Sequence, residues 1–188
     1  MSRMKLKDLL PHGILPEAEE DAIAYLRGDH DRVEDLFDDF DQIKHARDSA
    51  QKKHLVEELC RLVRVHTTLE EEIFYPAVRA EIADDDLMNE ARVEHESATR
   101  LVKELESMDA DDDMLNAKMH VLCAYLKHHV REEEQNMFRK ARDTSMDFRA
   151  IAARMRDRKL ELEELPVPAQ SGYKDRSGTT GPETRALR

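Results

Sequence analysis

Residues 23–40, IAYLRGDHDRVEDLFDDF, contain the pattern that decides the fold. Apolar side chains and one histidine recur there at alternating spacings of three and four residues, at Ile23, Leu26, His30, Val33, Phe37 and Phe40. This spacing places all of them on one face of an α-helix, as in a helix that packs into a bundle. The stretch therefore predicts a long amphipathic helix with a histidine on its buried face.

Three further stretches repeat this pattern, and each again has one histidine in its apolar stripe. The second runs over about residues 50–80, where Pro76 is expected to kink or end the last turns. The acidic runs 84–86 and 109–113 separate the later helices and can cap the helix that follows each run. The three stripes are Leu55, Leu59, Leu62, His66, Leu69 and Ile73; Met88, Ala91, His95, Ala98, Val102 and Leu105; and Leu115, Met119, Leu122, Leu126, His129 and Glu133.

Glycine is absent from Asp29 to Leu165, and Pro76 is the only proline in that range. A β-rich fold of this length would need turn glycines, whereas long helices do better without them. Because the connections are short, neighbouring helices should be antiparallel. We therefore predict an all-α protein built on an antiparallel up-down four-helix bundle.

The chain of 188 residues suits one domain with extensions at its ends. We expect an irregular N-terminal arm over residues 1–16, the bundle over 17–144 and an extra amphipathic helix over 145–165. The extra helix would bury Phe148, Ile151, Met155 and Leu162, and the polar, glycine- and proline-rich residues 166–188 read as a disordered tail.

The net charge of −12 argues against a nucleic-acid partner, because no basic stripe is available to neutralise phosphates. No stretch has the length and apolarity of a signal peptide or a membrane span, so we expect a cytoplasmic protein without a membrane partner. Cys60 and Cys123 fall near the apolar stripes and are interpreted as reduced, buried thiols.

The four stripes together contribute the histidines His30, His66, His95 and His129. Four buried imidazoles that face one interior would be costly without partners. A metal ion resolves this cost, because neutral imidazole is a preferred ligand of iron, copper and zinc. We therefore interpret the four histidines as a metal site in the bundle core.

Two of these histidines are followed four residues later by a glutamate, within HTTLEEEIFYP (66–76) and HHVREEEQNMF (128–138). This spacing puts both side chains on one helix face, within reach of the same ion. The pairs are His66 with Glu70, and His129 with Glu133. The competing pair His128 and Glu132 lies outside the apolar stripe, and we interpret it as a solvated flank.

In its order and spacing, this set of residues resembles the hemerythrin-like (HHE) cation-binding domain over about residues 20–142. The resemblance implies an antiparallel four-helix bundle that encloses two non-haem iron ions. Histidine and carboxylate ligands also suit zinc and manganese, so it is the resemblance that selects iron. By this analogy His30 and His66 bind one iron, and His95 and His129 bind the other. Glu70 and Glu133 bridge the two irons.

The chain departs from the oxygen-carrying hemerythrins, which have a fifth histidine where it has Thr99 and an aspartate where it has Glu134. The missing histidine implies an open coordination position, which favours sensing or turnover over reversible oxygen carriage. We expect a di-iron protein that binds O2, peroxide or NO, as a sensor or a modest peroxidase or catalase. The alternatives are iron storage or delivery, metal-cluster repair, or a metal-free helical interaction module. The oligomeric state stays open.

Other polar residues near the stripes have two possible roles. Glu34 and Glu94 could orient metal-binding imidazoles, although a solvated helix face is the favoured interpretation. Tyr75 and Tyr125 could donate hydrogen bonds to the site, although packing is favoured.

Overall fold

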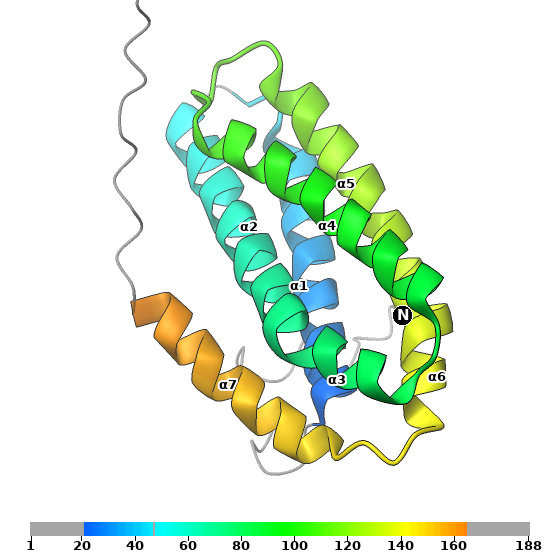
Figure 1. Ribbon diagram of the computed structural model, residues 1–188. Coiled ribbons are helices and arrows are strands. Elements are labelled where there is room, and N and C mark those ends of the chain that lie inside the picture. The colour runs from blue at the N-terminus through cyan, green and yellow to red at the C-terminus, as the bar shows by residue number, and fades with distance from the viewer. Residues whose placement is uncertain (1–20, 47, 165–188) are drawn as a thin grey trace, which may run out of the picture.

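The computed structural model describes residues 21–46 and 48–164, and within these ranges the chain forms helices and no strand. Four long helices lie side by side and form the bundle (Figure 1). They are α1 (Ala22–Ile43), α2 (Ser49–Leu69), α4 (Asp85–Glu106) and α5 (Leu115–Glu132). This confirms the all-α up-down bundle. The predicted N-terminal arm, the first residues of the predicted bundle (17–20) and the predicted tail lie outside the described residues.

Aspartates cap three of these helices. A carboxylate oxygen of Asp21, Asp48 or Asp84 accepts a hydrogen bond from the backbone N–H three residues later, at 3.0, 3.0 and 3.1 Å. Such bonds satisfy N–H groups that have no partner within the helix. The acidic run 84–86 therefore starts α4 as its sequence predicts.

Two of the long helices widen into a π-helical turn at the glutamate of the histidine–glutamate motif. Residues Glu70–Phe74 (η2) join α2 to α3 (Tyr75–Glu81), and Glu133–Met137 (η3) join α5 to α6 (Phe138–Arg142). The distortion expected at Pro76 thus begins earlier, before the proline. Since η3 contains no proline, Pro76 is not the shared cause of the two turns.

The apolar core is divided into two clusters along the bundle axis. One lies towards α3, α6 and α7 and includes Leu26, Leu69 and Phe138. The other lies towards the far end and includes Leu36, Leu59, Leu105, Leu122 and others. The stripe histidines come between the two clusters along α1, α4 and α5, and His66 lies next to their junction in α2, so the polar site lies where the two parts of the core meet.

The fifth long helix, α7 (Phe148–Glu164), crosses the outside of the bundle at the α3 end (Figure 1). Ile151, Ala152 and Met155 are its buried residues, and it contacts α1, α2 and η2. Ion pairs join Arg158 to Glu72 at 2.7 Å and Lys159 to Asp29 at 3.1 Å. Ion pairs therefore join the extra helix to the two helical segments that carry His30 and His66.

Both cysteines are free. Cys60 is buried, and burial raises the pKa of its thiol to about 12, whereas Cys123 is half-buried. Among the described residues, no helix combines the length and the apolar character needed to span a bilayer.

Candidate metal centre

All six residues expected to bind metal meet at one place in the bundle interior. Their exposed fractions are His30 6%, His66 5%, Glu70 0%, His95 1%, His129 3% and Glu133 2%. Each helix of the bundle contributes one histidine, and the two glutamates are the first residues of η2 and η3. Ionisable groups that are buried this completely need charged or hydrogen-bonding partners.

The four imidazoles form two pairs. The rings of His30 and His66 lie 4.9 Å apart, and those of His95 and His129 lie 4.7 Å apart, both in edge-on arrangements. Within the second pair the two Nε2 atoms are 3.2 Å apart. These are the two pairs that the resemblance assigns to separate ions.

Each glutamate lies between a histidine of one pair and a histidine of the other. Oε1 of Glu70 is 3.1 Å from Nε2 of His66, and Oε2 is 3.3 Å from Nε2 of His95. Oε2 of Glu133 is 3.3 Å from Nε2 of His30 and 4.0 Å from Nε2 of His129. Glu70 thus directs one oxygen towards each histidine pair, which is the placement that a bridging ligand requires, and Glu133 lies between the pairs with its Oε2 nearest to both.

The centre holds several buried polar atoms without a hydrogen-bond partner. They include Nε2 of His30 and of His66, and both carboxylate oxygens of Glu70 and of Glu133. All of them face the same small volume. His30, His66, Glu70 and Glu133 offer four ligand atoms within 4.8 Å of one another, and Glu70, His95 and His129 offer three. The donor set fits a cation at each histidine pair, with imidazole nitrogens as its own ligands and the carboxylates of Glu70 and Glu133 between the two pairs.

The Nδ1 atoms of the histidines point away from the centre, towards carboxylates. The bond from His129 Nδ1 to Oε2 of Glu94, at 2.8 Å, is one example. An ionised carboxylate only accepts hydrogen bonds, so Nδ1 carries the hydrogen and Nε2 of a neutral ring keeps its lone pair. Lone pairs that point inwards at close range repel one another unless a proton or a cation lies among them.

When no metal is bound, protons can occupy the space among the inward Nε2 atoms. Burial opposes the charged form of His66, but the carboxylates of Glu70 and Asp29 outweigh it and raise its pKa to about 10. Burial also opposes charging of His95, while Glu70 and Glu71 raise its pKa to about 9. Despite its burial, Glu70 has a pKa well below the usual range because His66 and His95 stabilise its charge. The centre is therefore strongly attractive to positive charge.

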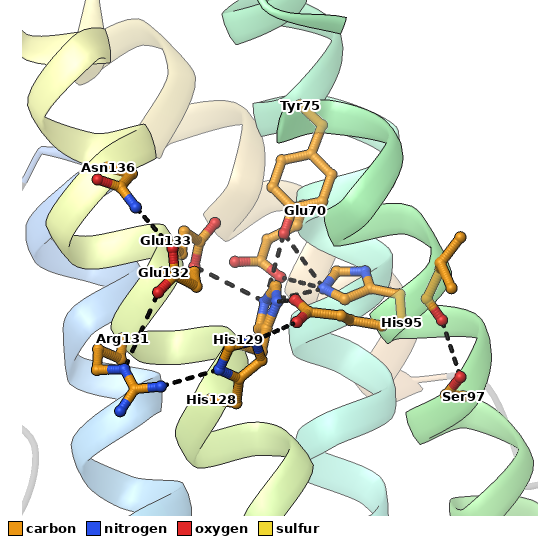
Figure 2. A network of polar contacts seen from close by, with 12 residues as sticks. Glu70, Tyr75, His95, Ser97, His128, His129, Arg131, Glu132, Glu133 and Asn136 are labelled. Atoms are coloured by element: carbon orange, nitrogen blue, oxygen red, sulfur yellow. Dashed lines mark hydrogen bonds and ion pairs between the residues drawn. The ribbon is translucent and has the colours of Figure 1, made fainter. Parts of the chain in front are cut away.

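Tyr75 also lies at the centre, although the sequence favoured a packing role over a hydrogen bond to the site. Its hydroxyl lies 3.2 Å from Nε2 of His95 and 3.5 Å from Nε2 of His129 (Figure 2). The π turn explains this position, because the Tyr75 N–H bonds to the carbonyl of Glu70 and the two side chains come to share a face. Burial and the charges of Glu133 and Glu70 raise the pKa of the phenol well above its usual value.

The structure buries His129 and leaves His128 half exposed. The His129 side chain is 4% exposed and points into the bundle, whereas that of His128 is 47% exposed and contacts Glu94 and Arg131 (Figure 2). Thr99 is half-buried and lines a surface groove between α2 and α4. At the inward Nε2 atoms of His95 and His129, the hydroxyl within 3.5 Å belongs to Tyr75 and not to Thr99.

The comparisons with known proteins agree with this geometry. The family model of the hemerythrin HHE cation-binding domain matches residues 21–141. The chain belongs to this family. As a member of the hemerythrin HHE family, it is a helical protein that binds metal cations, and the matched residues end just before α7 begins.

A solved structure has the same fold. It is the crystal structure of a hemerythrin HHE cation-binding domain-containing protein, an Rv2633c homolog from Mycobacterium kansasii. The two chains are 21% identical, with a TM-score of 0.62 over 76% of this chain and 87% of the other. At this identity the likeness concerns the fold. A search of curated protein sequences gives no significant match.

Proposed function

We propose that this hemerythrin HHE protein holds two non-haem irons and binds O2, peroxide or NO there, as a sensor or a modest peroxidase or catalase. The observation that carries the proposal is the pairing of the histidines around two shared carboxylates. Two cations would satisfy the inward Nε2 atoms and the unpartnered oxygens of Glu70 and Glu133 together.

The residues of such a site would have different roles. The proposed ligands are His30, His66, Glu70, His95, His129 and Glu133. Iron, when bound, supplies one-electron redox chemistry and affinity for small ligands. Two carboxylates offset only part of the charge of two divalent ions, so a small anion or the phenol oxygen of Tyr75 is attracted to the remaining charge.

The surroundings favour a small ligand. A hollow of about 300 Å³ between α1 and α5 is lined by His30, by apolar side chains that include Val33 and Phe37, and by charged ones that include Asp31 and Arg131. This volume is at the small end of the range for ligand pockets in proteins, which suits a small molecule better than a large substrate. The apolar clusters above and below the site limit the entry of water.

The test uses iron-loaded protein. The reduced form is prepared anaerobically and then mixed with NO or, separately, with O2. The oxidised form is mixed with azide and with peroxide, and each reaction is followed by optical spectroscopy. We expect spectral changes with NO and azide and measurable loss of peroxide. His66→Ala should reduce these changes, whereas His54→Ala, an exposed histidine on the same helix, should leave them intact.

Two results would contradict the proposal. Iron-loaded protein that responds to none of the four small molecules would not be a sensor or a peroxidase of this kind. Uptake of many irons per chain, rather than two, would support storage instead.

A further inference from the structure

Each metal-facing histidine contacts an acidic residue on its outer side. Nδ1 of His30 lies 2.9 Å from Oε1 of Glu134, and Nδ1 of His95 lies 3.0 Å from Oε1 of Glu71.

The other two histidines have the same arrangement. Nδ1 of His129 lies 2.8 Å from Oε2 of Glu94, and Nδ1 of His66 lies 3.6 Å from Oδ2 of Asp29. The last contact is longer than a hydrogen bond, and Asp29 is also bound by Lys159 at 3.1 Å. All four histidines therefore have an acidic group on the side away from the proposed metal.

The contacts follow one direction around the bundle and close on themselves. Asp29 of α1 contacts the histidine of α2, Glu71 at the end of α2 contacts that of α4, Glu94 of α4 contacts that of α5, and Glu134 beyond α5 contacts that of α1. Each helix thus orients the histidine of the next.

Each of these acids is also the chain neighbour of a proposed ligand. Asp29 precedes His30, Glu94 precedes His95, and Glu71 and Glu134 follow Glu70 and Glu133. On a helix, neighbouring side chains point about 100° apart, so one can face the centre while the other faces the seam with the next helix. A helix rotated so that its ligand faces the centre therefore also directs the neighbouring acid towards the histidine of the next helix.

We propose that Asp29, Glu71, Glu94 and Glu134 form a closed ring of positioning residues that hold the four histidines with Nε2 towards the metal. The proposal rests on the proposed metal site. A carboxylate that accepts from Nδ1–H fixes the tautomer and the ring orientation and makes Nε2 a stronger donor to the ion. Because the ring is closed, the helices fix one another's rotation at the level of the site.

The test compares substitutions inside and outside the ring, with zinc as a diamagnetic probe. Glu94→Gln is matched with Glu90→Gln, one turn earlier on α4, and Glu134→Gln with Glu132→Gln. Glu90 and Glu132 are exposed or half-buried and contact none of the four histidines in the described structure. We expect the ring variants to lower zinc affinity roughly 10- to 100-fold and the control variants to change it less than about twofold.

A second measurement separates positioning from general loss of structure. Nitrogen-15 NMR of the zinc-loaded protein should show slowly exchanging Nδ1–H signals from the histidines. Glu94→Gln should shift the signal of His129 and not that of its chain neighbour His95, and Glu71→Gln should shift that of His95. Unchanged signals and unchanged zinc affinity in the ring variants would overturn the ring.

Failure of the metal site would look different. If the wild-type protein binds neither zinc nor iron, the proposed function is wrong, and the ring is then tested by NMR of the metal-free protein. The same pairing of substitutions and shifted histidines there would support the ring as a structural device, and its absence would reject it.

Discussion

Tyr75 and Phe138 occupy equivalent places in the two halves of the site. Each follows a site glutamate by five residues, and each donates its backbone N–H to the carbonyl of that glutamate across a π turn. The Tyr75 hydroxyl lies 3.2 Å from Nε2 of His95, whereas the Phe138 ring stacks on His30 with 6.0 Å between ring centroids. One histidine pair therefore has a phenol beside it, and the other has an apolar ring.

Tyr75→Phe should weaken metal binding at one half of the site. The substitution removes the only oxygen of this side chain while keeping its packing, so the ion near His95 and His129 loses a neighbour and the ion near His30 and His66 does not. Stepwise titration with cobalt, followed by its optical bands, should show one weakened and one unchanged binding step. Tyr125→Phe is the control, because Tyr125 is 50% exposed. Two unchanged steps in Tyr75→Phe would show that the phenol takes no part.

Lys159→Gln should weaken metal binding at the His66 side of the site, although Lys159 lies on α7, outside the four-helix bundle. Lys159 on α7 holds Asp29, whose other oxygen faces His66. Loss of the cation frees Asp29 to rotate, so metal affinity should fall, by less than the 10- to 100-fold typical of a direct partner of a ligand. Arg154→Gln, on the same helix and exposed, is the matched control. Equal metal affinity of the Lys159 variant and the wild type would mean that α7 only covers the core.

Metal-free protein should lose stability as pH rises. Burial opposes protonation of His66 and His95, yet the surrounding carboxylates, including Glu70, raise their pKa values to about 10 and about 9, from 6.5. The folded chain therefore holds protons that the unfolded chain releases above about pH 6.5. This stabilisation is complete below that pH and is lost as pH rises through the folded pKa values. Urea unfolding of metal-free protein across this interval measures it.

Metal binding should show the opposite dependence. Ions must displace the same protons, so affinity should increase as pH rises through this interval. Stability of the metal-free protein that increases from neutral to alkaline pH would show that His66 and His95 are not held protonated by Glu70.

Much of the site could be predicted from the sequence because helical periodicity encodes it directly. His30, His66, His95 and His129 keep the phase of their apolar stripes, and this phase also selects His129 over His128. The spacing of four does the same for Glu70 and Glu133. These inferences need only the geometry of a regular helix.

The sequence allows roles for Tyr75 and Glu94 at the site but does not favour them, because these roles depend on more than the geometry of one regular helix. In a regular helix Tyr75 would point about 140° away from Glu70, and the π turn brings the two onto one face. Glu94 was expected to be solvated, but it contacts His129 on another helix, and its own sequence neighbour is His95. Periodicity within one helix cannot show which side chain on the next helix an outer residue meets.

The central claim is that the bundle holds two metal ions through these residues, and metal content measures it most directly. Protein purified from iron-replete cells should contain two irons per chain by elemental analysis. His129→Ala should lose at least one of them, whereas His128→Ala, the adjacent exposed histidine, should keep both. Wild-type protein without bound metal would contradict the account, as would loss of iron from the His128 variant but not from the His129 variant.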